Sequence, residues 1–256
     1  MDFMLQAYTD VGLRKKTNQD SILLEKAESS VGNIAFGVVC DGMGGFAKGE
    51  LASATLIKAF KEWFDYRLPD LICEGFSEVG LKTDWGNIVN TQNILIQRYG
   101  DRNGIRLGTT VTGILILDGK YHVINIGDSR TYLIRTDKVI QLTKDHTYIQ
   151  REMDAGRMTL EEANVSPQRS VLLQCVGASE EIYPDYFSGP VQGNEIFMLC
   201  CDGFRHVITE DEFLQYLNPE LIVNEEAMYD YAQYLTELNK YRNETDNISV
   251  GLIKVL

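Results

Sequence analysis

The sequence predicts an α+β fold in which amphipathic helices cover antiparallel β-sheet. Short apolar and β-branched runs bounded by Gly, Asp and Asn fill much of the 256-residue chain, and such runs are typical of strands. The pair Asp118-Gly119 joins two of these runs by a tight turn, which favours a hairpin and antiparallel pairing. Three longer segments between the strand groups carry one apolar stripe each, as expected of helices that cover a sheet.

The predicted strands follow one another in groups along the chain. In order they cover 5–12, 21–27, 32–42, 109–119, 120–129, 130–137, 138–143, 195–203 and 247–256. The predicted helices cover 50–64, 86–100 and 224–243, and the first aligns Leu56, Phe60 and Trp63 on one face. Because no linker, low-complexity tract or repeat divides the chain, residues 1–256 are predicted to form a single domain.

The segment 144–170 differs from its surroundings because it is polar and charged and carries two short helical turns. Such an insertion between strands is usually exposed and often acts as a lid. Thr147 is a candidate N-cap for the first of these turns. We refer to residues 144–170 as the flap.

Charge and cysteine content restrict the class of protein. The net charge of −13 argues against nonspecific binding to nucleic acid or to an anionic membrane, and it is compatible either with metal ligation or simply with solubility. No apolar run approaches the roughly 20 residues that cross a bilayer, and the N-terminus lacks an export pattern. The odd number of cysteines, five, makes a disulfide framework unexpected, so we predict a cytoplasmic protein without membrane insertion.

Five predicted strands have an aspartate at one end. These residues are Asp20, Asp41, Asp128, Asp202 and Asp246. Each of them alone is explained as a turn residue, and the sequence does not show that the five ends converge. If they do converge, a cation is needed to keep the carboxylates ionised, and oxygen ligands favour Mg²⁺ or Mn²⁺ over zinc.

Glycines accompany these aspartates. Gly42, Gly44 and Gly45 follow Asp41, and without side chains they would let a backbone carbonyl and bound water approach an ion closely.

Seven motifs follow one another along essentially the whole chain: TDVGLRKKTNQDS, CDGMGG, GTTVTG, NIGDSRTYLIR, LTKDHT, CDGF and TDNISV. In their order and spacing they resemble the compact bacterial members of the metal-dependent Ser/Thr protein phosphatases of the PPM type, also called type 2C. The resemblance implies a four-layer αββα sandwich, in which helices flank two antiparallel sheets, with a metal centre at one end.

The resemblance also implies a role for each aspartate. Asp41 would bridge two Mn²⁺ or Mg²⁺ ions, and the carbonyl of Gly42 would ligate one of them. Asp202 and Asp246 would hold the other ion, and Asp20 would act through bound water. Asp128 matches a residue that helps to hold a weaker third ion. With Asp41 and Asp202 at the catalytic centre, a metal-bridging hydroxide would hydrolyse phosphoserine or phosphothreonine directly.

The chain departs from the family pattern at several positions. Lys15 stands where an Arg usually grips the substrate phosphate, and since Lys cannot form a bidentate fork we predict weaker binding, or substitution by Arg14. Met43 stands where eukaryotic members often carry a His that protonates the leaving group. His206 replaces an Asp of the third metal site, and it either ligates a metal or is simply hydrogen bonded.

Three further side chains receive structural interpretations. His146 matches a family position beside the active site, and we interpret it as a turn or capping residue rather than a catalytic one. Arg130 and Arg169 are candidates for structural ion pairs.

Three functions compete. The first is a phosphoprotein phosphatase whose partners are phosphorylated proteins, including a Ser/Thr kinase that it opposes. The second is a noncatalytic PPM-like binding or scaffold module, which the presence of all the core aspartates disfavours. The third, an unrelated Mg²⁺-dependent phosphodiesterase or nuclease, is disfavoured by the acidic charge balance. The sequence does not identify the substrate proteins.

Overall fold

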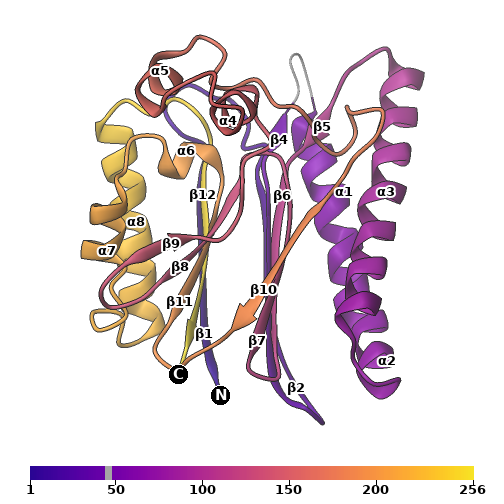
Figure 1. Cartoon of the computed structure of the whole chain (residues 1–256), viewed down its shortest axis with the longest axis vertical. Coiled ribbons are helices and arrows are strands. Elements are labelled where there is room, and N and C mark those ends of the chain that lie inside the picture. Colours follow the sequence, from indigo (N-terminus) through magenta and orange to yellow (C-terminus); the bar gives the residue numbers. More distant parts are fainter. Residues whose placement is uncertain (44–47) are drawn as a thin grey trace.

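Two five-stranded antiparallel sheets pack face to face at the centre of the molecule (Figure 1). The computed structural model describes residues 1–43 and 48–256, so the predictions for Gly44 and Gly45 lie outside the described residues. The first sheet has the order β1 (Phe3–Asp10), β12 (Ile248–Val255), β11 (Ile196–Cys200), β8 (Arg130–Ile134), β9 (Val139–Gln141). The second has the order β10 (Asp185–Pro190), β7 (Lys120–Ile126), β6 (Val111–Leu117), β3 (Gly32–Cys40), β2 (Ser21–Ser29). A short pair, β4 (Gly42–Met43) and β5 (Gly108–Thr109), lies beside them.

Helices cover the outer face of each sheet (Figure 1). The second sheet is covered by α1 (Gly49–Glu62), the π-helical turn η1 (Trp63–Arg67), α2 (Leu68–Cys73) and α3 (Glu78–Asn103). The first sheet is covered by α7 (Glu210–Tyr216) and α8 (Glu225–Tyr241). This arrangement confirms the predicted four-layer αββα sandwich. Over residues 1–43 and 48–256, no helix has the combined length and apolar character needed to span a membrane.

Strand β3 shows how the sequence builds these layers. Its alternate side chains Ile34, Phe36 and Val38 pack toward the helices, whereas Ala35 and Val39 face the other sheet. Because both faces of the strand are buried, its sequence reads as a continuous apolar run. Phe36 stacks on Phe64, with the ring centroids 5.3 Å apart, and thereby joins the sheet to its helical layer.

Two pairs of hydroxyl groups cross between the sheets. The Thr112 and Thr131 hydroxyls lie 2.7 Å apart and join β6 to β8. The Thr110 and Ser129 hydroxyls, also 2.7 Å apart, make a second link just beyond these strands. All four residues are buried, so each hydroxyl finds its partner within the protein.

Several boundaries differ from the prediction. Helix α3 begins at Glu78 rather than at residue 86, because Ser77 caps it by accepting a hydrogen bond from the Gly80 N–H at 3.1 Å. The predicted strand 195–203 ends at Cys200, and Asp202 opens the helical turn α6 (Asp202–Arg205). The unpredicted strand β10 lies at the edge of its sheet beside β7, and an edge strand tolerates its Ser-Gly-Pro sequence.

The flap contains two short helices, α4 (Tyr148–Asp154) and α5 (Leu160–Val165), at one end of the sandwich (Figure 1). The Thr147 hydroxyl accepts a hydrogen bond from the Gln150 N–H at 3.2 Å, which confirms the predicted N-cap. The assignment of residues 1–256 to a single domain stays a prediction.

Candidate metal centre

The ends of several strands meet at the flap end of the sandwich and line a cavity of about 420 Å³. Asp41 follows β3, Asp128 lies between β7 and β8, Asp202 follows β11, and Asp246 precedes β12. These four aspartates line the cavity together with Gly42 and Lys15 of the predicted site. Asp20 completes the group, because donor atoms of Asp20, Asp41 and Cys201 lie within 4.8 Å of one another. The five strand ends singled out in the sequence therefore converge.

Backbone hydrogen bonds hold Asp41 in place where β3 ends. The Asp41 N–H donates to the Thr110 hydroxyl at 3.0 Å, and the Asp41 carbonyl accepts from the Thr110 N–H at 2.9 Å. The Thr109 hydroxyl donates to the same carbonyl at 2.9 Å. Because the backbone of Asp41 is satisfied in this way, its carboxylate is available to the cavity.

Gly42 is required by close packing of three chain segments. Its N–H donates to the Gln19 carbonyl at 3.2 Å. A Cβ at this position would overlap the carbonyl oxygens of Gln19 and Gly49, which belong to the backbone and have little room to move. The absence of a side chain therefore allows the turn after Asp41 to lie against the start of α1.

Replacement of Gly42 by Ala is expected to lower the free energy of unfolding by about 1–3 kcal/mol, the usual cost of overpacking. Urea denaturation followed by circular dichroism measures the change. Gly193→Ala is the matched control, since a Cβ there would meet no atom within 4 Å. Equal stability of the two variants would contradict the packing explanation for Gly42.

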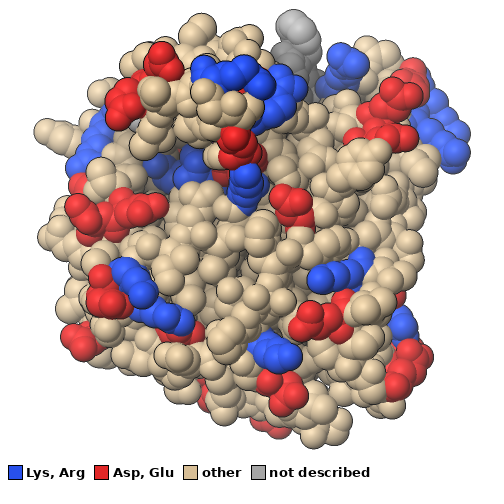
Figure 2. Space-filling model, viewed as in Figure 1, with Lys and Arg blue, Asp and Glu red and all other residues tan. Residues whose placement is uncertain are grey.

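Two of the carboxylates at the centre keep oxygens that the described part of the protein leaves without a partner. Both carboxylate oxygens of Asp20 and Oδ1 of Asp202 are buried without a hydrogen-bond partner among the described residues. On the face drawn in Figure 2, by contrast, acidic and basic side chains are interspersed. Exposed charges elsewhere form ion pairs, as Lys61 does with Asp65. Buried, unpartnered carboxylate oxygens are the donor set that a hard divalent cation prefers, so these residues fit Mg²⁺ or Mn²⁺.

The pKa values reflect this crowding. Burial raises the pKa of Asp20 to about 7 against the opposing effect of the nearby Ser249 hydroxyl and Cys201 thiol, and the neighbouring charges of Asp202 and Asp246 add to the increase. Although part of the Asp41 surface stays accessible, its carboxylate lies deep among the others. Burial and the charges of Asp20 and Asp202 raise the pKa of Asp41 well above its usual value. A bound cation would counter these effects and hold the carboxylates ionised.

Lys15 is a positively charged side chain in the lining of the cavity. Its Nζ lies 2.7 Å from Oδ1 of Asp246. Burial lowers the pKa of Lys15, but the hydrogen bond to Asp246 and the charges of Asp41 and Asp202 outweigh it, so the pKa is raised. Arg14 is exposed and lies outside the lining of the cavity.

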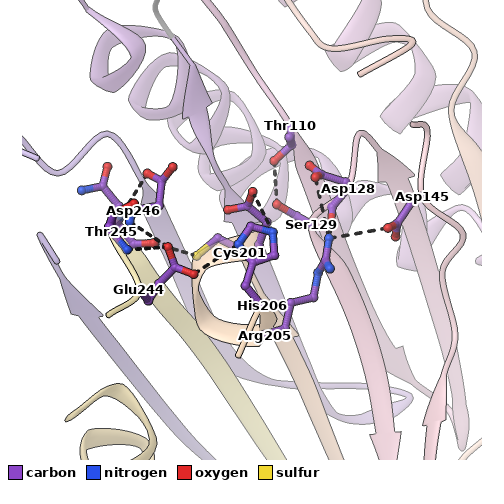
Figure 3. Close-up of polar contacts among 12 residues, drawn as sticks. Thr110, Asp128, Ser129, Asp145, Cys201, Arg205, His206, Glu244, Thr245 and Asp246 are labelled. Atoms are coloured by element: carbon purple, nitrogen blue, oxygen red, sulfur yellow. Dashed lines mark hydrogen bonds and ion pairs between the residues drawn. The ribbon is translucent and has the colours of Figure 1, made fainter. Parts of the chain in front are cut away.

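His206 is held between two carboxylates (Figure 3). Its Nδ1 lies 3.3 Å from Oε2 of Glu244, and its Nε2 lies 3.4 Å from Oδ2 of Asp202. Burial lowers the pKa of His206, but the hydrogen bond with Glu244 and the charge of Asp202 raise it overall. Glu244 was not predicted from the sequence. Its carboxylate also accepts the N–H groups of Thr245 and Asp246, at 2.6 and 2.9 Å, which shapes the turn before β12.

The remaining predicted side chains occupy different environments. Arg130 forms a bidentate ion pair with Asp145, with both N···O distances 2.7 Å, as predicted. The prediction for Arg169 is wrong: this residue makes no ion pair within the described part of the chain, and it lines the cavity from the flap. His146 lies outside the cavity lining, where its Nδ1 accepts the Gly127 N–H at 3.2 Å, in keeping with a role in the turn.

Comparisons with known proteins agree with this geometry. A putative protein phosphatase 2C-type of Streptococcus pyogenes is 28% identical over 248 residues, which are 96% of this chain and 94% of that protein. The protein phosphatase PhpP of Streptococcus pneumoniae is 27% identical over 249 residues, or 96% and 95% of the two chains.

Solved structures show the same fold. The S. agalactiae serine/threonine phosphatase superposes with a TM-score of 0.84 at 26% identity, and the match covers 100% of both chains. The catalytic domain of the serine threonine protein phosphatase PstP, in complex with 2 manganese ions, gives a TM-score of 0.78 at 27% identity, over 99% and 98% of the two chains. The model of the family Protein phosphatase 2C matches residues 8–168, more than half of the sequence. The chain therefore belongs to the protein phosphatase 2C family of metal-dependent protein-serine/threonine phosphatases.

Proposed function

We propose that the protein hydrolyses phosphoserine and phosphothreonine residues of other proteins at a centre of two divalent metal ions. The observation that carries this proposal is the convergence of aspartates from five strand ends, where several buried oxygens have no partner in the part of the chain that the structure describes. The relatives named as serine/threonine phosphatases support the substrate class. The PstP domain in complex with 2 manganese ions supports the number and kind of ions.

Each residue of the centre has a proposed role. Asp41 would lie between the two ions, and the Gly42 carbonyl would ligate one of them. Asp202 and Asp246 would hold the second ion, with Asp20 behind them acting through water. Bound divalent ions supply a water of lowered pKa and neutralise the charge of a phosphoester. The protein supplies the fixed positions of the carboxylates.

The protein also provides a positive charge that can bind the phosphate of the substrate. Lys15 stands at the cavity and is paired with Asp246 through its Nζ. From this position the Lys15 ammonium group can donate a hydrogen bond to a phosphate oxygen while it keeps its ion pair with Asp246. We therefore assign phosphate binding to Lys15 rather than to Arg14, which is exposed outside the cavity.

Replacement of Lys15 by Ala is expected to raise KM for a phosphothreonine peptide by about 10-fold or more, because a charge-assisted hydrogen bond contributes roughly 1.5–3 kcal/mol. Steady-state kinetics at saturating Mn²⁺ measures the change. Lys16→Ala, an exposed lysine outside the cavity, is the matched control. If KM increased in Arg14→Ala and stayed unchanged in Lys15→Ala, phosphate binding would be assigned to Arg14 instead.

The proposed function is tested by phosphate release from a phosphothreonine peptide with Mn²⁺, with Mg²⁺ and with a chelator. We expect release with the metals, none with the chelator, and loss of release in Asp202→Ala. A folded protein that binds the peptide but releases no phosphate with either ion would support the noncatalytic binding module instead.

The proposed partners are phosphorylated proteins, with a Ser/Thr kinase among them. The proposed location is the cytoplasm, where cysteines such as Cys40 and Cys201, both free and buried here, stay reduced.

A further inference from the structure

The guanidinium group of Arg205 lies beside Asp128 and provides a positive charge next to its carboxylate. The Arg205 guanidinium donates to the Asp128 carbonyl at 2.9 Å, and its Nη2 lies 3.7 Å from Oδ2 of the same residue. Both side chains are only 11% exposed. Arg205 reaches this position because it stands three residues after Asp202, at the end of the turn α6. Figure 3 shows the Arg205 side chain directed toward Asp128.

Arg205 also joins Asp128 to the base of the flap. Its Nη2 lies 3.5 Å from Oδ2 of Asp145, a buried residue that Arg130 binds in bidentate fashion (Figure 3). The cluster of Asp128, Asp145, Arg130 and Arg205 therefore contains two carboxylates and two guanidiniums. Within this cluster the formal charges balance. Burial and the charge of Asp202, which lies outside the cluster, raise the pKa of Asp128 to about 7, and the charge of Arg205 opposes this increase.

A divalent ion on Asp128 would meet unfavourable surroundings. It would lie beside the Arg205 guanidinium, and like charges in a partly buried site repel strongly. The neighbouring carboxylate of Asp202 is already assigned to the two-ion centre, and both ring nitrogens of His206 face carboxylates, those of Glu244 and Asp202. The residues present thus do not fit the weaker third ion that the resemblance implied for Asp128.

We propose that the Arg205 guanidinium takes the place of a third metal ion, so that the centre holds two divalent ions and Asp128 is neutralised by the protein. This inference rests on the proposed function, since it presumes a two-ion centre. Arg205 is a positioning residue: it fixes Asp128 and couples the turn that carries Asp202 to the base of the flap. The position of Asp128 would then not depend on the metal concentration.

The test counts bound Mn²⁺ on the full chain by equilibrium dialysis and isothermal titration calorimetry. We expect two ions per wild-type chain. Asp128→Asn is expected to keep the count at two with affinities within about threefold of wild type, since its carboxylate is not a ligand. The double variant Arg205→Ser with His206→Asp removes the guanidinium and adds a carboxylate, and it is expected to bind three ions. Arg135→Ser, which breaks an ion pair with the buried Glu195 away from the cavity, is the matched control and should bind two.

The outcomes separate this inference from the function on which it rests. Three ions on the wild-type chain, or the loss of one ion in Asp128→Asn, would overturn the role of Arg205 and leave the phosphatase centre intact. A folded wild-type chain that binds no Mn²⁺ would overturn both proposals. If the double variant does not fold, as judged by circular dichroism, the counts for wild type and Asp128→Asn still decide the question.

Discussion

Replacement of Asp41 by Asn is expected to lower kcat/KM for a phosphothreonine peptide by more than about 100-fold, and to weaken Mn²⁺ binding. The amide keeps the shape of the side chain and removes the charge that we place between the two ions. Mutation of a residue that hydrogen-bonds to a metal ligand typically lowers metal affinity or activity by roughly 10- to 100-fold. Mutation of a ligand itself should therefore have a larger effect. Peptide hydrolysis at increasing Mn²⁺ concentration measures both effects.

Asp118→Asn is the matched control for this variant. Asp118 lies in an exposed hairpin turn with a positive φ of 49°, a conformation that Asn also adopts readily. The kcat/KM of Asp118→Asn is expected to stay within about twofold of the wild-type value, because surface substitutions of this kind rarely change stability by more than about 0.5 kcal/mol. An Asp41→Asn variant with the activity of this control would contradict the assignment of Asp41.

Removal of divalent ions with a chelator at pH 8 is expected to lower the melting temperature by about 5–10 °C. A ligand at about 100 times its Kd stabilises the folded state by roughly 2.7 kcal/mol, and each kcal/mol corresponds to about 2–4 °C for a chain of this size. Differential scanning calorimetry of the loaded and stripped protein measures the difference.

The difference in melting temperature between the metal-loaded and the metal-free protein should depend on pH. The pKa of Asp20 in the metal-free folded protein is raised to about 7 by burial and by neighbouring charges, above the usual 3.8 of an aspartate. Between these values the folded chain holds more protons than the unfolded chain, so the metal-free protein loses stability as the pH rises toward 7. Protons also compete with the ions at the carboxylates that would ligate them directly. We therefore expect a larger difference at pH 8 than at pH 6, and an equal difference would show that Asp20 does not take part.

Local patterns in the sequence were enough to predict most of the sandwich. Buried strands such as β3 are marked by continuous apolar residues, and the amphipathic stripe of α8 was recognisable from its spacing. The aspartates were singled out because each follows or precedes a recognisable strand, whereas their roles at a metal centre were implied by the family resemblance. Strand β10 could not be predicted because an edge strand needs little apolar alternation, and its partner β7 lies far away in the sequence.

The contacts that tune the centre were harder to predict because they depend on strand order. Arg205 and Asp128 are 77 residues apart, and they meet only because β11 and β8 are neighbours in one sheet. Glu244 becomes important because the turn before β12 brings it to His206. Neither pairing has a local signature in the sequence.

The two hydroxyl pairs that link the sheets help to fix the distances between the carboxylates of the centre. Asp41 is carried by one sheet, and Asp202 and Asp246 are carried by the other. Apolar contact between two sheets is non-directional and would tolerate a small sliding displacement. The links Thr112–Thr131 and Thr110–Ser129 are directional and weaken steeply when their geometry changes. The translational alignment of the two sheets, and with it the spacing of the carboxylates, is therefore held to the tolerance of a hydrogen bond.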